Sequence, residues 1–327
     1  MATGSGGARG GALRGRLRRL VSGRDDPRIR ATYRVLLAMP TFWVLAGGVL
    51  AGNIQARVAA VPAGGEPLGG LSASLLHGGF VLLLLLGWAR YVDRRALSDY
   101  GVSASPSWTV DLVVGLGALF AAFALWFAVA VGLGWATVGV AASAPRAALP
   151  VAIAVYVVAL GIHSLIQQLV FFRVIVGNAA EGLHSRGVTA RRAAVAGVLA
   201  AVPVFIAMHQ LTVDLAMLDL AVVGVIYGLL YVHTGELAYG LGLHLGTFVA
   251  GGVLFVPASA TAGTASLLAV RQSLPDSVAV LGEYGFPKVV LAYLLLLAFM
   301  TWRHGEVPVE ADVARWPPSP AQTSSTS

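Results

Sequence analysis

The amino-acid sequence predicts an all-α protein, a polytopic membrane bundle of about eight transmembrane helices, on three observations. Of its 327 residues, 57% are hydrophobic and only 11% are charged, whereas soluble domains carry about a quarter charged residues. Several apolar runs approach or exceed the ~18 residues that mark a membrane-spanning helix. The basic residues, nearly all arginine, gather beside those runs, as they do in membrane proteins.

Each predicted span is an apolar run. The spans cover about residues 35–53, 71–90, 109–134, 148–176, 192–210, 213–232, 237–256 and 286–302. Very short connections join the fifth, sixth and seventh spans, so we expect those helices to be antiparallel neighbours. Stretches rich in glycine and alanine, such as AAVAGVLAAVPVF, let helix backbones approach closely inside a membrane.

The arginines indicate the orientation of the chain. The segments predicted to be cytoplasmic hold the N-terminal cluster and Arg90, Arg94, Arg95, Arg186, Arg191, Arg192 and Arg303. The opposite side holds only Arg57, Arg146 and Arg271. Because positive residues favour the cytoplasmic side, we expect a multi-pass protein of the cell membrane with both termini cytoplasmic.

The segments outside the spans complete the predicted organisation. Residues 1–34 are expected to form a basic, disordered cytoplasmic tail, since no short apolar core with a cleavage site follows them directly. Residues 35–147 hold the N-terminal transmembrane helices, and 148–256 hold the core helices. Residues 257–285 are expected to form an extracytoplasmic loop with room for a short surface helix. The last transmembrane helix occupies 286–303, and the low-complexity tail, 304–327, is expected to be disordered.

Composition also excludes several classes of function. The net charge of +7 comes from arginines beside the spans, so the lipid bilayer, and no nucleic acid, is the predicted partner. The chain has no cysteine, which excludes disulfides and thiolate catalysis. It has no P-loop and no dinucleotide fingerprint, and no cofactor is predicted.

Polar residues inside the predicted spans are the candidate functional residues, because such groups are costly in a membrane and usually face a bundle interior. The segment GIHSLIQQLVFFR carries four of them: His163, Gln167, Gln168 and Arg173. FIAMH carries Phe205 and His209 one helical turn apart, and HLGTF carries His244 and Phe248 with the same spacing.

Each of these groups also has a purely structural interpretation. His209 and His244 could be neutral histidines bonded to a neighbouring carbonyl, and Arg173 could snorkel to the interface. Gln167 and Gln168 could bond across helices, which is worth roughly 1 kcal/mol.

Taken together, the polar groups favour a shared cavity. Two histidines beside a base that activates water would suit peptide hydrolysis, since they can stabilise the oxyanion and position the scissile carbonyl. His163 is offset around its helix and is expected to pack or to line the cavity. His233 and Glu236 fall in a turn that we expect to be cytoplasmic and solvated.

These motifs, in this order, resemble the CAAX-processing and bacteriocin-processing family (CPBP, also called Abi) of intramembrane endopeptidases. That family carries Glu-Glu-x-x-x-Arg, Phe-x-x-x-His and His-x-x-x-Asn or Asp on successive core helices. Here Arg173 matches the end of the first motif, FIAMH matches the second, and His244 begins the third. The similarity covers roughly residues 160–250, with weaker similarity from about 90 to 130, and implies a CAAX-protease-like catalytic core within 148–256.

The resemblance implies an intramembrane endopeptidase that activates water to hydrolyse a membrane-associated or prenylated peptide or protein. The implied catalytic positions are Gln168, Arg173, His209 and His244, and the implied cavity-lining residues are Gln167, Phe205, Phe248 and His163. Gln168 stands where the family has its first glutamate, and Leu169 stands at the second. Because an amide accepts no proton, this departure removes a general base, which typically costs about 10²–10⁴ in rate.

Two other hypotheses stay open. The chain could be a catalytically silent pseudoprotease that acts as a membrane binding or regulatory protein, since glutamine still donates and accepts hydrogen bonds. Asp214 is the best spare carboxylate in the sequence, ahead of Glu181 and Asp219. A zinc site would draw on the histidines of the three core helices, but HExxH-like spacing is missing and no metal is predicted.

Overall fold

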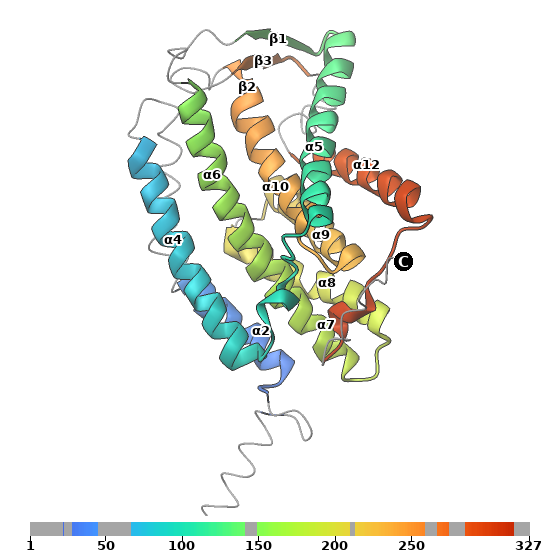
Figure 1. Ribbon diagram of the computed structural model, residues 1–327. Coiled ribbons are helices and arrows are strands. Elements are labelled where there is room, and N and C mark those ends of the chain that lie inside the picture. Colours follow the sequence, from blue (N-terminus) through green and yellow to red (C-terminus); the bar gives the residue numbers. More distant parts are fainter. Residues whose placement is uncertain are drawn as a thin grey trace, which may run out of the picture.

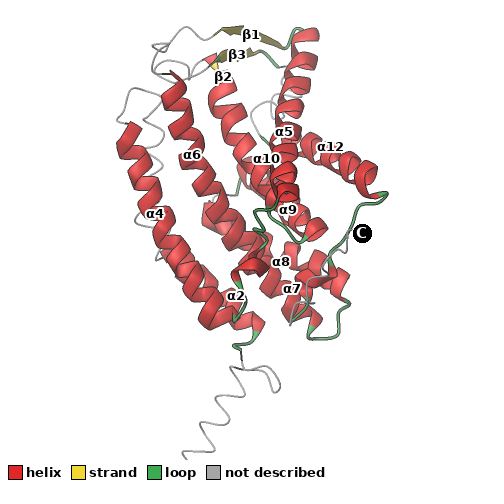
Figure 2. Ribbon diagram, viewed as in Figure 1, coloured by secondary structure: helices red, strands yellow, loops and turns green. Residues whose placement is uncertain are grey.

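A computed structural model describes residue 22 and residues 28–44, 67–140, 149–209, 213–258, 267–274 and 285–316. Over these ranges the chain is a helical bundle with one small sheet (Figure 1 and Figure 2). The α-helices are α2 (Ala31–Met39), α4 (Pro67–Gly87), α5 (Pro106–Gly132), α6 (Leu149–Gln167), α7 (Gly177–His184), α8 (Ala190–His209), α9 (Leu215–Thr234), α10 (Ala238–Val249) and α12 (Phe286–His304).

Short segments of π-helix, which is wider than an α-helix, and of 3₁₀-helix, which is tighter, lie between or beside these helices. The π-helical segments are η1 (Pro40–Val44), η2 (Trp88–Asp93), η4 (Gln168–Val176) and η5 (Ala250–Leu254). The 3₁₀ segments are η3 (Leu97–Tyr100) and η7 (Ala311–Ala314). The π-helical segment η4 joins α6 to α7 without a break, and such i→i+5 segments occur frequently at functional sites.

Six described helical segments are long and apolar enough to cross a membrane, which supports the predicted multi-pass helical bundle. They are Ser74–Asp93, Pro106–Gly132, Ile153–His184, Ala190–His209, Leu215–Thr234 and Phe286–His304. The seventh predicted span corresponds to a shorter apolar helix, Ala238–Leu254. The first, 35–53, is described only as far as Val44, so the number eight stays a prediction.

The small sheet is a departure from the predicted all-α fold. It consists of β1 (Ala136–Val140), β2 (Phe255–Pro257) and β3 (Leu268–Gln272), in the order β1-β3-β2. β3 pairs antiparallel with β1 and parallel with β2. The sheet covers one end of the bundle, opposite α7 (Figure 1). The described part of the predicted 257–285 loop therefore contains strand residues, while the rest of that loop lies outside the described residues.

Glycine contacts hold α10 close to α5, its neighbour in Figure 1. A Cβ atom on Gly115 of α5 would lie 2.5 Å from the backbone oxygen of Tyr239 in α10. Gly242 of α10 has equally little room against the backbone of Leu112 in α5. Small residues at these crossings allow the close packing that drives helix association in membranes.

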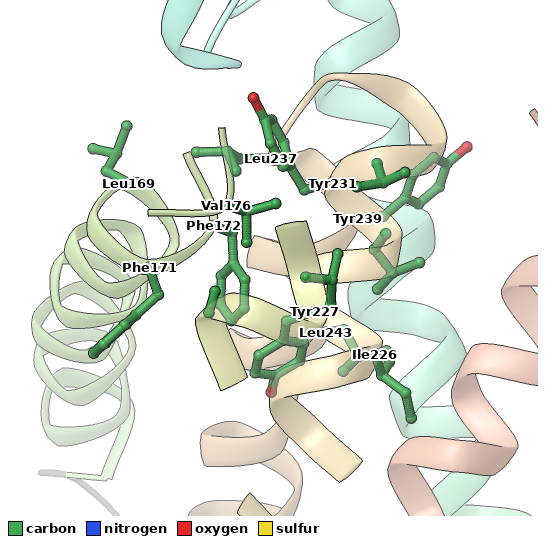
Figure 3. Packing of buried hydrophobic residues seen from close by; sticks show 14 of the residues in the cluster. Leu169, Phe171, Phe172, Val176, Ile226, Tyr227, Tyr231, Leu237, Tyr239 and Leu243 are labelled. Atoms are coloured by element: carbon green, nitrogen blue, oxygen red, sulfur yellow. The ribbon is translucent and has the colours of Figure 1, made fainter. Parts of the chain in front are cut away.

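Buried aromatic and aliphatic side chains from η4, α9 and α10 form the centre of the bundle (Figure 3). Phe172 of η4 meets Tyr227 of α9 edge to face, with ring centroids 5.8 Å apart. Tyr231 lies one turn further along α9 and is also buried. The apolar residues of η4 in this core lie between two polar residues of the same segment, Gln168 and Arg173, and therefore fix where both are placed.

Candidate functional site

Five polar side chains from four helical segments meet in the bundle; two of them are buried, two are half-buried, and His209 is exposed. They are His163 and Gln167 of α6, Gln168 at the start of η4, His209 at the end of α8 and His244 of α10. We call them the His–Gln cluster. The short connections between α8, α9 and α10 fold these helices back on one another, so residues 163 to 244 reach one place.

Gln167 bridges two histidines of the cluster. Its Nε2 lies 2.9 Å from Nε2 of His163 and 3.4 Å from Nε2 of His209. His209 Nδ1 lies 2.7 Å from the backbone oxygen of Phe205, and because a carbonyl only accepts, Nδ1 must carry the proton. Nε2 of neutral His209 therefore has a lone pair, which faces the amide of Gln167. An amide NH₂ has two hydrogens and can donate to both histidines.

Gln168 and His244 form the deeper half of the cluster. Gln168 Nε2 lies 3.5 Å from His244 Nδ1, which is a long contact, and both side chains are buried. Gln168 Oε1 is buried and has no hydrogen-bond partner among the described residues. This oxygen lies against Gly240 of α10, where a Cβ atom would come within 2.7 Å of it. Gly240 therefore leaves the space that the amide occupies.

Aromatic rings enclose the cluster. The His244 ring lies between Tyr227, at 4.9 Å, and Phe248, which stacks on it at 5.2 Å. Phe205 packs on His209 with ring centroids 4.3 Å apart. The structure thus brings together seven of the eight residues singled out in the sequence: His163, Gln167, Gln168, Phe205, His209, His244 and Phe248.

Arg173, the eighth residue, lies in other surroundings. Its Nε donates to the backbone oxygen of Asp99 at 2.5 Å, and its guanidinium lies over the ring of Tyr100. Arg173 is only 4% exposed, so its guanidinium is held by protein groups, and whether it reaches the membrane interface stays a prediction. It lines a polar pocket of about 280 Å³ at the ends of η3 and α9.

The turn after α9 is less solvated than the sequence indicates. His233 is buried, its Nδ1 donates to the backbone oxygen of Pro308 at 2.7 Å, and its Nε2 lies 2.9 Å from the Tyr293 hydroxyl. Glu236 is half-buried, and burial raises the pKa of its carboxyl group. The C-terminal segment that covers this turn comes from more than 70 residues further along the chain, so the local sequence carries no sign of it.

The spare carboxylates all have structural partners. Asp214 caps α9 by accepting from the backbone N–H of Met217 at 3.1 Å. Asp219 accepts from the backbone N–H of Phe286 at 2.6 Å, at the start of α12. Glu181 pairs with arginines, as described below. The hydrogen-bond contacts of the His–Gln cluster run between its own histidines and glutamines and to the Phe205 carbonyl.

Two features were missed in the sequence. His77 of α4 is buried and lies within electrostatic range of His163, where α4 packs on α6. Glu181 accepts from Arg28 at 2.5 Å, from Arg34 at 2.6 Å and from Arg95 at 3.2 Å. The many arginines in the sequence indicate that some of them pair with carboxylates, but they do not indicate which carboxylate each arginine contacts.

The chain is a helical bundle whose six long apolar helices are compatible with a multi-pass membrane protein, and it holds a His–Gln cluster and a separate arginine-lined pocket. Comparison with protein-family models, curated proteins and solved structures gives no match to this chain. Among the described residues no group of three or more His, Cys, Asp or Glu side chains is arranged to hold a metal ion, so nothing in the geometry favours the zinc hypothesis.

Proposed function

We propose that this chain is a CPBP-type intramembrane endopeptidase in which His209 serves as the base that activates water. The observation that carries the proposal is the fixed tautomer of His209. Its Nδ1–H is held by the Phe205 carbonyl, and its Nε2 lone pair faces the cluster beside Gln167. A histidine oriented by a second hydrogen bond is the usual form of a general base.

The remaining residues of the cluster fit the other tasks of peptide hydrolysis. A water that replaces the long contact between Gln167 Nε2 and His209 Nε2 would give its proton to His209 Nε2 as its oxygen attacks the scissile carbonyl. If Gln168 Nε2 donates to His244 Nδ1, then His244 carries its own proton on Nε2 and can donate to the oxyanion. The protonated His209 would then give its proton to the leaving amine, which completes the cleavage.

A second candidate, the catalytically silent pseudoprotease, is supported by a different observation. Gln167 and Gln168 cannot ionise, and the described carboxylates bond elsewhere. The unpartnered Oε1 of Gln168 and the Gln167 amide would then bind the backbone of a membrane-associated peptide without cleaving it.

A peptidase assay with purified protein separates the two candidates. The substrates are quenched fluorescent apolar peptides in detergent micelles, and the variants are His209→Ala, Gln168→Glu and, as a control, His304→Ala, which alters an exposed histidine at the end of α12. The endopeptidase proposal expects wild-type cleavage that falls by about 10²–10⁴ in His209→Ala and is unchanged in His304→Ala.

The silent candidate expects no wild-type cleavage, together with peptide binding that Gln168→Glu alters. Cleavage that appears only in Gln168→Glu would reject His209 as a sufficient base. If the wild type neither cleaves nor binds any peptide, both candidates are wrong.

A further inference from the structure

The pocket beside Arg173 is a second polar site, separate from the His–Gln cluster. Its lining comes from η3, from η4, from the turn between α9 and α10, and from the segment around η7. Arg95 and Arg173 lie in its wall, and both side chains are at least nine-tenths buried. The inference drawn from this pocket does not depend on the proposed peptidase function.

Among the described residues, Glu181 is the one carboxylate within ion-pairing distance of the two arginines of the pocket. Arg95 reaches Glu181 at 3.2 Å, but the same carboxylate also pairs with Arg28 and Arg34. Arg173 has no carboxylate within ion-pairing distance among the described residues, and its hydrogen bond is to a backbone oxygen.

The arginines of the pocket also repel each other. Burial, and after it the charge of Arg173, lowers the pKa of Arg95. An anion placed between the two guanidiniums would offset this repulsion and would give Arg173 a direct ion pair, in addition to the more distant charges of Asp93 and Asp99. Paired guanidiniums favour phosphate and carboxylate groups, which they can bind with two hydrogen bonds each.

The outer part of the pocket has the opposite charge. Asp99 accepts from the backbone N–H of Ala96, and Asp312 pairs with Arg315, but Glu236 and Glu310 also line the pocket. Glu310 is exposed, whereas Arg173 is buried, so the positive charge lies deeper than the negative charge. A ligand that carries only negative charge would meet repulsion at this rim.

We propose that this pocket binds a phosphodiester that carries an amine, the chemistry of a phosphoethanolamine head group. Its phosphate lies between Arg95 and Arg173, and its ammonium group lies toward Glu236 and Glu310. The pocket sits at the ends of membrane-crossing helices, where lipid head groups are concentrated. The same chemistry also occurs in soluble compounds, and the experiment below distinguishes the two sources.

The test is a binding measurement on the full chain in detergent. Calorimetric titration uses glycerophosphoethanolamine and, as the probe without an amine, glycerophosphoglycerol. Native mass spectrometry of the same protein measures retained phosphatidylethanolamine and phosphatidylglycerol. The wild type is expected to prefer the ethanolamine compound of each pair. Lipid retention without binding of the soluble probe assigns the site to the bilayer, and the reverse assigns it to a soluble ligand.

Three variants define the site. Arg173→Gln is expected to weaken ethanolamine binding about 10–100-fold, the value of a charge-assisted contact. If that variant does not fold, Arg173→Lys keeps the charge, loses the paired hydrogen bonds, and is expected to weaken binding by a smaller factor. Glu236→Gln is expected to reduce the preference for ethanolamine over glycerol. Arg192→Gln, which changes an exposed arginine outside the pocket, is the control.

The proposal is overturned if the wild type binds neither the soluble compounds nor the lipids. It is also overturned if folded Arg173→Gln binds as tightly as Arg192→Gln. Equal binding of the ethanolamine and glycerol compounds, unchanged in Glu236→Gln, would overturn the assignment of the amine.

Discussion

Replacing Glu181 by glutamine tests how much the buried arginines depend on this carboxylate, since Arg34 also pairs with Asp93 at 3.4 Å. Oε1 of Glu181 contacts Arg28 at 2.5 Å and Arg34 at 2.6 Å, while Oε2 contacts Arg28 at 3.3 Å and Arg95 at 3.2 Å. Glutamine keeps the shape of the side chain but removes its charge. Three buried guanidiniums would then lose the negative charge that they share.

The expected loss is large because the group is buried. Unit charges 4 Å apart attract by about 4 kcal/mol at an effective dielectric constant of 20. Several such attractions vanish together, although part of the loss is recovered because glutamine costs less to bury than a carboxylate. Removing one partner of a buried pair lowers the free energy of unfolding by about 3–5 kcal/mol, and we expect Glu181→Gln to fall in this range.

The assay is equilibrium unfolding of the detergent-solubilised protein, followed by tryptophan fluorescence, at two salt concentrations. Asp312→Asn is the matched control, because Asp312 pairs with Arg315 at 3.2 Å and both side chains are nearly half exposed. The control is expected to lose at most about 1 kcal/mol. The loss in Glu181→Gln should persist in high salt, since buried pairs are weakly screened. A loss below that of Asp312→Asn would refute the reasoning.

Three further predictions concern packing, capping and pH. Gly115→Ala should lower the free energy of unfolding by about 1–3 kcal/mol, because the added methyl group overpacks against α10. Gly117→Ala should leave the free energy of unfolding unchanged, because the space around Gly117 is open. Unfolding curves of both variants check this. Asp219→Ala should cost about 1–3 kcal/mol because the Phe286 N–H loses its acceptor, and Asp219→Asn should cost less because it keeps one. Burial raises the pKa of Glu236, so the folded protein disfavours its charged form and loses stability as pH rises above about 4.3, the pKa of an unperturbed glutamate. Glu236→Gln should therefore be more stable than wild type at pH 7 but not below about pH 4, as unfolding measured at both pH values will show.

The His–Gln cluster is the part of the molecule that the sequence indicates best. Apolar runs locate the helices, and the short connections after α8 and α9 make the helices that carry His209 and His244 both neighbours of α9. The one-turn spacing of Phe205 and His209 also predicts their contact, which the structure has at 4.3 Å.

The surroundings of Arg173 show why the partners of the buried charged residues were not predictable from the sequence. Its partners Asp99 and Tyr100 precede it by more than 70 residues, and Arg28 is 153 residues from Glu181. Hydropathy patterns report which residues face away from lipid, but they do not say which distant segment supplies a counter-charge. The sheet was missed for a similar reason, because β1 and β3 become strands only by pairing with each other.

The charges around position 168 explain why an amide stands there and a carboxylate does not. Gln168 is fully buried, its neighbours in the cluster are histidines and an amide, and its hydrogen-bond contact is to His244. Arg173, five residues further along, is turned toward Asp99 and Tyr100 and supplies no charge to this position. A carboxylate here would be an unpaired buried charge unless His244 took up a proton. Glutamine avoids that cost while keeping the hydrogen-bonding shape. The Gln168→Glu variant is therefore expected to protonate His244, which the imidazole NMR signals of that variant will show, and a neutral His244 beside a charged carboxylate at position 168 would contradict this expectation.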